Sequence, residues 1–524
     1  MMPDQADQSG AAEGQAEVVR FLTDPATHDG ADVTVYRTHG SWVFAAGDRV
    51  LKMKRAVTFS YLDYGSLYQR HYFCEEEVRI NRRTAPEIYL GVLAVTRRAD
   101  GGLELGGEGE PVEWLVRMRR FHDADLLDQI CERDGLSPEL CRAVADRILA
   151  FHLSAPVVLD RDPAAELAEV SRTSIAEMRR HGADFFDPGR VARLQAVWAG
   201  AQTRLSVLMR ERGADDPVSG RRVRHAHGDL HLRNIVMWQG VPTPFDAIEF
   251  DPAIAEIDVL YDLAFLLMDL LFRGRSAAAN RILNRYLGCS GDYAGLPLLP
   301  LFLSDRAGIR AHTTASAAAA AGDEEAAPLR ACAGDYLRLA LRAMQPARPR
   351  VVAIGGVSGT GKSTAAAGLA AETDGNGGIG AIVLRSDVIR KRLNGVAPET
   401  RLPAEAYRPE MSGKVFAQLA ADLDRCLDAG QPVILDAVFG SPANLAPVQD
   451  VLSKHGLTLD GIWLTADAEL LRQRVRDRRD DASDAGPEVL EAQLDRLDAP
   501  ADWRVVDAGG SPERTLANIR AALR

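Results

Sequence analysis

The spacing of hydrophobic residues changes along this chain of 524 residues. Between residues 33 and 55 apolar and polar positions alternate and are rich in Val, Tyr, Trp and Phe, which predicts two or three antiparallel strands. We expect a charged helix at CEEEVRI, a strand after Pro86 and a hairpin over LELGGEGEPVEWLVRMRRF. From about residue 122 to 340 the spacing becomes helical, as in LCRAVADRILAFHL. This pattern predicts a small sheet-rich lobe to about residue 121, followed by a larger helical lobe.

The last third of the chain alternates between short apolar runs and helical stretches. The runs are VVAIGGV, AIVLRS, PVILDAV, GIWLTA and WRVVDA, and each but the last precedes a helical stretch. Strands joined by helical crossovers form a parallel sheet that is covered on both faces. We therefore predict an α/β domain with a five-stranded parallel sheet over residues 350–524, after a linker at 341–349. The alanine-rich TTASAAAAAGDEEAAP before it, interrupted by Gly322 and Pro328, is expected to be a surface loop or frayed helix.

Composition limits the choice of partners and compartment. The formal net charge of −12 disfavours nucleic acid or an anionic membrane as the main partner. Six scattered cysteines without a Cys-x-x-Cys pair predict reduced thiols in a cytoplasmic protein. The most apolar stretch, residues 259–272, is too short to span a bilayer. Residues 1–28 are polar and acidic at their start and predict a flexible tail, and no feature of the sequence sets the oligomeric state.

A complete phosphate-binding loop follows the first strand of the C-terminal region. The pattern G-x-x-x-x-G-K-[ST] is met between an apolar strand and an alanine-rich helix, which is the context that the motif requires. Successive backbone N–H groups and the helix N-terminus would bind the phosphates of ATP. Lys362 would reach the β- and γ-phosphates, and Ser363 would ligate Mg²⁺. The predicted nucleotide site consists of Gly356, Val357, Ser358, Gly359, Thr360, Gly361, Lys362, Ser363 and Thr364.

Two further strands of this region end in carboxylates. In LRSDVIRKRL, Asp387 is placed to accept a proton from a substrate hydroxyl, and Arg390 to hold substrate or phosphate. A helix-capping aspartate followed by a solvated arginine would give the same letters. Asp436, at the end of PVILDAV, has the position of a Walker-B carboxylate that holds the magnesium shell.

An arginine-rich stretch, LLRQRVRDRR, suggests a lid over the γ-phosphate. Arg474 and Arg478 share a face at helical spacing and would close over the phosphate as its charge shifts, although a solvated helix face is the alternative. Residues 350–524 resemble AAA-type P-loop kinases, a group that includes gluconate kinases, zeta-type toxins and the 5′-hydroxyl polynucleotide kinase domain. In polynucleotide kinases the aspartate of S-D-x-x-R is the base, which the resemblance transfers to Asp387.

The second informative stretch is HAHGDLHLRNIVMW. Phosphoryl transfer needs a base for the acceptor hydroxyl and a ligand for magnesium, and Asp229 and Asn234 fill these roles at the spacing seen in kinases. Taken alone, the short motif would favour a turn with a capping Asn over a catalytic site. Downstream, IEF and IDVLYDLA follow, so that residues 29–340 resemble aminoglycoside phosphotransferases and related choline or fructosamine kinases.

That resemblance implies a bilobal α+β fold like that of protein kinases, and a magnesium-binding aspartate in I-D-[FW]. Here Glu249 takes that place, while Asp246 and Asp251 lie close by, so any of the three is a candidate metal ligand. In RVLKMKR, Lys52 is the expected strand lysine for the α- and β-phosphates, with Lys54 as the alternative. Glu77 is its expected helix partner, ahead of Glu76.

Together the motifs predict a fusion of two kinase-like modules, and the chain resembles bacterial phosphotransferase/ATPase fusions. The expected activity is bifunctional, MgATP-dependent phosphoryl transfer to a hydroxyl of a small molecule such as a sugar, amino sugar or aminoglycoside-like compound. Three different functions stay open. The N-terminal module is a binding pseudokinase, the P-loop module acts on 5′-hydroxyl oligonucleotides, or the protein is a nucleotide-gated interaction protein.

Overall fold

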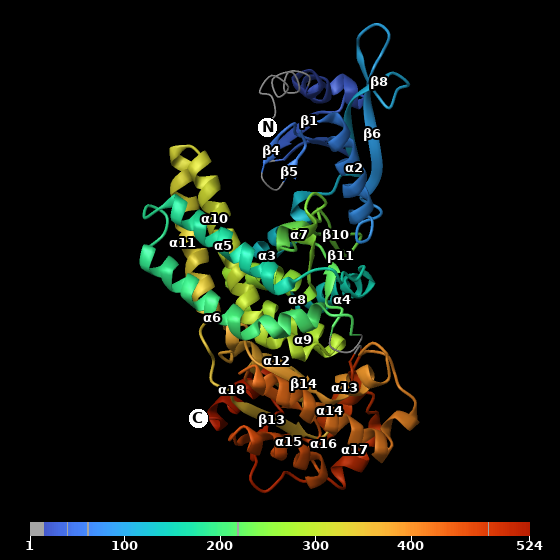
Figure 1. Cartoon of the computed structure of the whole chain (residues 1–524). Helices are drawn as coiled ribbons and strands as arrows, with labels where there is room; N and C mark the ends of the chain where they lie inside the picture. Colours follow the sequence, from blue (N-terminus) through green and yellow to red (C-terminus); the bar gives the residue numbers. More distant parts are fainter. Residues whose placement is uncertain (1–14, 39, 60–61, 217–219, 480) are drawn as a thin grey trace. The chain divides into compact units, whose positions relative to one another are not determined.

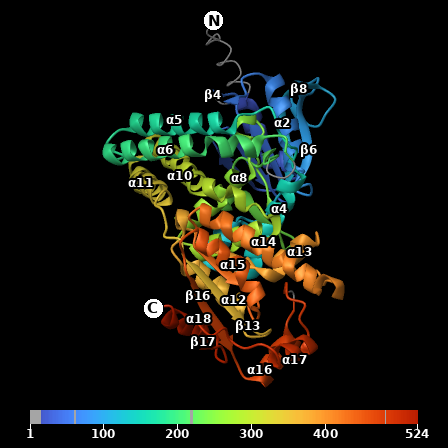
Figure 2. The same ribbon diagram turned by 60° about the horizontal axis from the view of Figure 1, so that its bottom comes forward.

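The computed structural model describes residues 15–38, 40–59, 62–216, 220–479 and 481–524 (Figures 1 and 2). Internal contacts divide the chain into two compact units. Unit 1 comprises Met1–Leu136, Ala150–Arg161 and Gly220–Leu263, and unit 2 comprises Ser137–Leu149, Asp162–Ser219 and Ala264–Arg524. Within the described ranges, no helix combines the length and the apolar character that crossing a membrane requires.

Unit 1 contains a six-stranded antiparallel sheet in the order β1-β2-β3-β8-β6-β7. The predicted strands between residues 33 and 55 are confirmed, but the predicted hairpin is wrong because β7 pairs with β6 and not with β8. Strand β8 instead lies between β3 and β6, where its apolar side chains are buried. The strands are β1 (Val33–Arg37), β2 (Ser41–Ala46), β3 (Arg49–Lys54), β6 (Tyr89–Arg97), β7 (Leu103–Leu105) and β8 (Glu110–Arg119), and helix α2 (Leu67–Asn81) contacts β6 and β8.

The described part of the predicted N-terminal tail is folded. Residues 15–23 are helical and are followed by η1 (Pro25–His28). Val18 and Leu22 are buried against the sheet, and the Gln15 amide donates to the Lys54 carbonyl at 2.8 Å. The apolar Val and Leu at four-residue spacing form the buried face of this helix. Residues 1–14 of the expected tail lie outside the described residues.

Short strands and turns in the rest of unit 1 connect the loops that contain the predicted site residues. β9 (Val223–His225) pairs with β12 (Glu256–Asp258), and β10 (Ile235–Trp238) pairs with β11 (Val241–Pro244). The remaining short elements are β4 (Thr58–Phe59), β5 (Leu62–Asp63), η2 (Asp123–Asp125), α3 (Leu127–Arg133), η3 (Leu232–Asn234) and α7 (Pro252–Ala255). Two helices, α4 (Pro138–Ser154) and α8 (Val259–Phe272), contribute residues to both units.

The helical part of unit 2 includes the alanine-rich segment, for which the expected loop is wrong. α10 (Leu299–Ala320) runs through the alanines, and α11 (Asp323–Ala343) follows after only two residues. Gly322 precedes α11, whereas Pro328 lies inside that helix. Alanine is the strongest helix former, and the buried face of α10 adds packing to that propensity. The other helices here are α5 (Pro163–His181), α6 (Pro188–Gly213), α9 (Ser276–Ser290) and η4 (Tyr293–Leu298).

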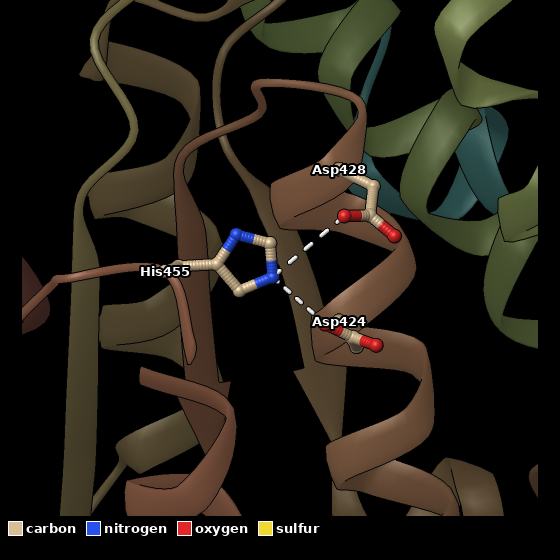
Figure 3. Close-up of side chains that lie close together, drawn as sticks. All are labelled: Asp424, Asp428 and His455. Atoms are coloured by element: carbon tan, nitrogen blue, oxygen red, sulfur yellow. Dashed lines mark hydrogen bonds and ion pairs between the residues drawn. The ribbon is translucent and has the colours of Figure 1, made fainter. Parts of the chain in front are cut away.

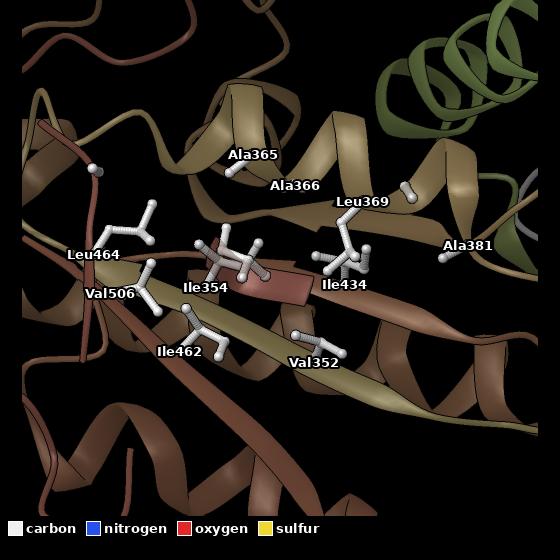
Figure 4. Close-up of a cluster of buried hydrophobic side chains, with 13 residues drawn as sticks. Val352, Ile354, Ala365, Ala366, Leu369, Ala381, Ile434, Ile462, Leu464 and Val506 are labelled. Atoms are coloured by element: carbon white, nitrogen blue, oxygen red, sulfur yellow. The ribbon is translucent and has the colours of Figure 1, made fainter. Parts of the chain in front are cut away.

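The P-loop domain, residues 350–524, has the predicted five-stranded parallel sheet, in the order β14-β15-β13-β16-β17. The strands are β13 (Val351–Gly356), β14 (Ile382–Arg385), β15 (Val433–Asp436), β16 (Leu459–Thr465) and β17 (Arg504–Asp507). Helices α12 (Lys362–Glu372) and α18 (Pro512–Ala522) bury their apolar side chains against Val352, Ile354, Ile434 and Ile462 (Figure 4). This core fixes the carboxyl ends of the strands, where the predicted site residues lie.

Further helices complete this domain. They are α13 (Ser386–Leu393), α14 (Pro409–Asp428), α15 (Pro442–Lys454), α16 (Ala468–Asp477) and α17 (Pro487–Leu494), with the short turns η5 (Asn376–Gly378) and η6 (Ala404–Tyr407). α14 contacts β14 and β15, and α16 contacts α17. The predicted mixture of an antiparallel sheet with helices and the predicted α/β domain are both present.

Candidate active sites

The P-loop connects β13 to α12 through glycines whose backbone requires the absence of a side chain. Gly356 (φ +134°), Gly359 (φ +85°) and Gly361 (φ +84°) lie in the left-handed region. A Cβ on Gly356 would lie 2.6 Å from the Leu464 carbonyl oxygen. The Lys362 ammonium donates to the Val357 carbonyl at 2.9 Å, and burial lowers the pKa of Lys362. Among the described residues, the Lys362 ammonium therefore has no ion pair with a carboxylate.

The residues beside Lys362 fit a magnesium ion. Asp436 ends β15, is buried, and lines the same cavity as Ser363, the residue after Lys362. Its Oδ2 atom has no hydrogen-bond partner among the described residues, although Arg385 Nε lies 3.3 Å away. Burial raises the pKa of Asp436. A hydroxyl oxygen beside a carboxylate with a spare oxygen is the donor set that Mg²⁺ prefers.

Asp387 lies in the first turn of α13, directly after β14 ends. It is half-buried, lines the same cavity as the P-loop, and makes no hydrogen bond or ion pair with any described residue. That cavity has a volume of 850 Å³. A carboxylate left without a partner in such a cavity is free to accept a hydrogen bond from a bound hydroxyl.

Arg390, three residues later, is held by the protein. Its Nη1 donates to the Ala406 carbonyl at 2.7 Å, and its guanidinium lies 4.8 Å from the centre of the Tyr407 ring. The side chain lines the cavity, but the residue is only 7% exposed. These contacts attach η6 to α13, so that Arg390 supports the cavity wall.

The observed positions of the two predicted lid arginines, Arg474 and Arg478, differ from the prediction in one respect. Arg474 lies on α16, but that helix ends at Asp477 and Arg478 follows it in extended backbone, so the two do not share a helix face. Arg474 donates to the carbonyls of Ala508 (2.9 Å) and Gly510 (3.2 Å). Both arginines nevertheless line the cavity of the P-loop.

Sequence reasoning missed two residues of this site. Arg385, at the end of β14, pairs with Asp436 and donates to Asp481 at 2.6 Å. The Gln493 side chain accepts a hydrogen bond of 2.8 Å from the Ser358 backbone N–H in the P-loop. Arg385 directly precedes the S-D-x-x-R element and could have been included with it, whereas no local pattern points to Gln493.

In unit 1 the predicted lysine and its helix partner are in contact. The Lys52 ammonium donates to Glu77 Oε1 at 2.8 Å and to Asp246 Oδ1 at 2.6 Å. Lys54, on the same face of β3, donates to Glu77 Oε2 at 2.8 Å and also to Glu249. Burial alone would raise the pKa of Glu77, but the two ammonium groups lower it to about 2. Glu76 instead pairs with Arg79 on the surface.

The three candidate metal carboxylates lie in different surroundings. The Glu249 side chain is 6% exposed and accepts hydrogen bonds from Lys54 and from the Tyr64 hydroxyl (2.6 Å). Asp251 caps α7 through the Ala253 N–H. The Asp246 side chain is 45% exposed beside Lys52, on a backbone with φ +60°. Of the three, Asp246 is the exposed carboxylate, and it lies beside Lys52.

The His-Gly-Asp turn presents Asp229 next to Asn234. The Asn234 amide donates to Asp229 Oδ2 and to the Asp229 carbonyl, both at 2.9 Å. Gly228 has φ +84°, and a Cβ there would meet the Ile254 carbonyl at 3.0 Å. The structure thus brings together the two residues that the motif predicts.

The support of this turn was not predicted. Asp262 is fully buried and accepts hydrogen bonds from the backbone N–H groups of His227 (3.0 Å) and Gly228 (2.9 Å). His152 Nε2 lies 3.1 Å from the same carboxylate. Burial alone would raise the pKa of Asp262, but these hydrogen bonds keep it below its usual value. The signal was available, since Asp262 is the second aspartate of IDVLYDLA.

One group outside both sites has the composition of a metal site. Asp424, Asp428 and His455 lie together at the ends of α14 and α15 (Figure 3). His455 Nε2 lies 2.8 Å from Asp424 Oδ1, and Lys454 donates to the same carboxylate at 2.7 Å. A lysine already neutralises Asp424, so the group is a surface ion-pair cluster.

The amino-acid sequence was compared with protein families and with curated proteins. Residues 351–500 match the family model described as an AAA domain. Curated proteins from Mycobacterium tuberculosis and Mycobacterium bovis, each described as an uncharacterized protein, are 30% identical to this chain over 506 residues. The alignment covers 92% of this chain and 94% of the relatives. The chain belongs to the same family as these mycobacterial proteins. Its members therefore share both regions, and not the P-loop domain alone.

Solved kinase structures resemble one region or the other. A sugar kinase from Janibacter sp. HTCC2649 is 26% identical, with a TM-score of 0.25, over 33% of this chain and 94% of its own. A gluconokinase from Sinorhizobium meliloti 1021 is 19% identical, with a TM-score of 0.25, over 34% and 93%. A choline/ethanolamine kinase family protein from Mesorhizobium loti is 15% identical, with a TM-score of 0.38, over 63% and 99%.

Proposed function

We propose that the P-loop domain is an ATP-dependent phosphotransferase that moves the γ-phosphoryl group to a hydroxyl of a small molecule. A sugar, an amino sugar or an aminoglycoside-like compound is the acceptor class. The observation that carries the proposal is the shared cavity. Its lining includes the Lys362 ammonium, the side-chain oxygens of Ser363 and Asp436, and the Asp387 carboxylate. These are a phosphate-binding cation, a metal-binding oxygen pair and a base.

The chemistry follows from these groups. Asp387 accepts the proton of the acceptor hydroxyl while that oxygen forms a bond to the γ-phosphorus. The bond between the γ-phosphorus and the bridging oxygen breaks, and ADP leaves with that oxygen. Lys362, and the arginines 474 and 478 that line the cavity, stabilise negative charge on the transferred group. When bound by Ser363 and Asp436, Mg²⁺ would neutralise part of the phosphate charge.

The test is the Asp387→Asn variant of the full chain. We expect phosphoryl transfer to fall by about 10²–10⁴-fold, the usual contribution of a positioned base. The affinity for ATP should stay near that of the wild type, because Asp387 does not belong to the phosphate loop. Asp424→Asn, in the surface ion-pair cluster, is the matched control and should transfer phosphate normally. A fully active Asp387→Asn protein would remove the proposed base.

A second activity is proposed for unit 1, as a kinase that uses Asp229 as base. The contact between Lys52 and Glu77 and the contact between Asn234 and Asp229 support it, since both pairs have roles in kinases. Asp246, with Asn234, would bind the metal. Because Asp246 and Glu77 already occupy Lys52, the competing function is that of a pseudokinase, in which unit 1 binds a ligand without transfer.

Nucleotide binding in a Lys362→Ala background tests unit 1. MgATP should still bind, and Lys52→Met should weaken that binding. Phosphorylation of an acceptor that requires Asp229 would support kinase activity. Binding without any transfer dependent on Asp229 would favour the pseudokinase.

An oligonucleotide acceptor and a nucleotide-gated interaction are the competing functions of the P-loop domain. A 5′-hydroxyl oligonucleotide acceptor is disfavoured by the net charge of −12 and by the burial of Arg390; salt-sensitive oligonucleotide binding would support it. A nucleotide-gated interaction protein would hydrolyse ATP slowly and release a partner without phosphorylating any hydroxyl. We propose a cytoplasmic location, which agrees with the six free cysteines.

A further inference from the structure

Helix α9 covers the free edge of the sheet in the P-loop domain. Strand β14 is an edge strand, and the Asn280 amide donates to the carbonyls of Ile379 (2.8 Å) and Ala381 (2.9 Å), just before it. One turn later, Asn284 donates to the Ala381 carbonyl at 3.1 Å and accepts from the Val383 N–H at 2.7 Å. Backbone groups at a sheet edge need partners, and two asparagine side chains supply them here.

Glycines on α9 and on the facing segment of the P-loop domain allow the two to approach closely. A Cβ on Gly380 (φ +89°) would lie 2.6 Å from the Asn280 amide nitrogen. On α9 itself, a Cβ on Gly288 would lie 3.2 Å from a methyl group of Val388 on α13. The nearest neighbour of a Cβ on Gly380 would be the Ala370 carbonyl oxygen of α12, at 2.4 Å, so a side chain there would also disturb the P-loop domain itself. A side chain at Gly288 would tighten the contact between α9 and α13.

An ion-pair network extends this contact beyond α13. Arg285, next to Asn284, donates to both oxygens of Asp146 (2.6 and 2.8 Å) and of Glu399 (2.7 and 3.0 Å). Burial alone would lower the pKa of Arg285, but these hydrogen bonds raise it. Glu399 lies between α13 and η6, so Arg285 fixes the segment that follows α13.

The C-terminal end of α13 is attached to the same surface. Arg392 donates to the Gly288 carbonyl at 3.3 Å, and its guanidinium lies 5.5 Å from the centre of the Tyr293 ring. Contacts from α9 and η4 thus reach β14, the end of α13 and the segment after it. Asp387 lies between these attachment points.

We propose that helix α9 contributes to catalysis at the P-loop site. Its residues Asn280, Asn284 and Arg285 are positioning residues that hold Asp387 toward the acceptor. The proposal rests on the phosphotransferase function proposed above. Among the described residues, no hydrogen bond from α9 ends on the P-loop. Disturbing α9 should therefore slow transfer more than it weakens ATP binding. The helical region would then contribute positioning residues to the P-loop site, which gives the fusion a physical role.

The experiment uses full-length Asn284→Leu and Arg285→Met, with Arg281→Met as the matched control. Arg281 lies on the same helix and makes no hydrogen bond or ion pair with any described residue. We expect kcat for acceptor phosphorylation to fall by about ten- to a hundredfold in the first two variants, as for a displaced catalytic group. The KM for ATP should change by less than about twofold, and Arg285→Lys, which keeps the charge, should recover part of the rate. Arg281→Met should behave like the wild type.

A second measurement separates this proposal from the one on which it depends. Amide hydrogen exchange over residues 382–393 should be faster in Asn284→Leu than in the wild type and in Arg281→Met. If the wild type binds ATP but phosphorylates no hydroxyl, the phosphotransferase function fails, and exchange still tests whether α9 holds Asp387. Unchanged exchange, or unchanged kcat per ATP-binding site with only a lower Tm, would overturn the positioning role.

Discussion

The two candidate sites present their charges in opposite ways. In unit 1, Lys52 and Lys54 are each bonded to carboxylates, and Glu77 connects them. In the P-loop domain, Lys362 is bonded to a backbone carbonyl and Asp387 has no hydrogen-bond partner among the described residues. A ligand phosphate in unit 1 must compete with carboxylates that the fold already supplies. At the P-loop, backbone geometry organises the site and leaves Lys362 and Asp387 without an ion-pair partner among the described residues, although Arg385 pairs with Asp436 there.

This difference means that the same kind of substitution should have different consequences in the two regions. Removing a charge from the unit 1 network should mainly cost stability, because its partners stay buried. Removing a charge from the P-loop site should mainly cost activity. The following predictions use this contrast, from the largest expected effect to the smallest.

Glu77→Gln should be the most destabilising change, because it leaves two ammonium groups in a buried network with one carboxylate fewer. Breaking a buried ion pair costs about 3–5 kcal/mol of the free energy of unfolding. Glu76→Gln, at the neighbouring position, where the 21% exposed carboxylate pairs with Arg79, should change it by less than about 1 kcal/mol. Urea unfolding of the full-length variants, compared with the wild type, measures both changes in the free energy of unfolding. Equal stability of the two variants would contradict a structural role for the network.

Lys362→Ala should lower phosphoryl transfer at the P-loop by about 10²–10³-fold, as removal of a preorganised electrostatic donor does. Thermal unfolding should hardly change, because the ammonium bonds only to the Val357 carbonyl. Steady-state transfer and a thermal melt on the same preparation separate the two effects. Inactivity together with a large loss of stability would place Lys362 among the structural residues instead.

Asp246→Asn and Glu249→Gln should differ in their effect on metal-dependent nucleotide binding by unit 1. The Asp246 carboxylate is exposed and should be required for metal binding. Its substitution should therefore weaken MgATP binding by about tenfold, as loss of a group in the shell around a metal does. Glu249 is enclosed by Lys54 and Tyr64, and its substitution should act on stability instead. Titrations with MgATP in the Lys362→Ala background distinguish the two. Weaker binding from Glu249→Gln alone would reverse the assignment.

The smallest predicted effect concerns pH. Burial raises the pKa of Asp436, so this carboxylate takes up a proton at a higher pH than an ordinary aspartate. Mg²⁺ binds the ionised form, and the Mg²⁺ concentration needed for half-maximal activity should therefore rise as the pH falls toward this raised pKa. Asp436→Asn should lose that pH dependence along with most of the activity. A Mg²⁺ requirement that is constant with pH would contradict the assignment.

The sequence was most informative where the chemistry is contiguous. Gly356 to Thr364 could be predicted as a unit because strand, loop and helix adjoin in the chain. The unit 1 site is assembled from segments nearly 200 residues apart, so the contacts of Lys52 with Glu77 and Asp246 needed tertiary structure. Periodicity alone placed β7 beside β8, because it reports which segments are strands and not which strands pair. Burial of Glu249, and the contacts of α9 with β14, depend on side-chain packing that no local pattern contains.

The most direct test of the account is acceptor phosphorylation by the full-length protein, by Lys362→Ala and by Asp229→Ala. The assay would follow transfer from ATP to a panel of sugars, amino sugars, aminoglycosides and 5′-hydroxyl oligonucleotides. The account predicts that Lys362→Ala abolishes phosphorylation of a hydroxyl acceptor that Asp229→Ala still phosphorylates. An acceptor whose phosphorylation is lost only in Asp229→Ala would add unit 1 as a second kinase. Full retention of all phosphorylation by Lys362→Ala would contradict the central claim that the P-loop domain transfers phosphate.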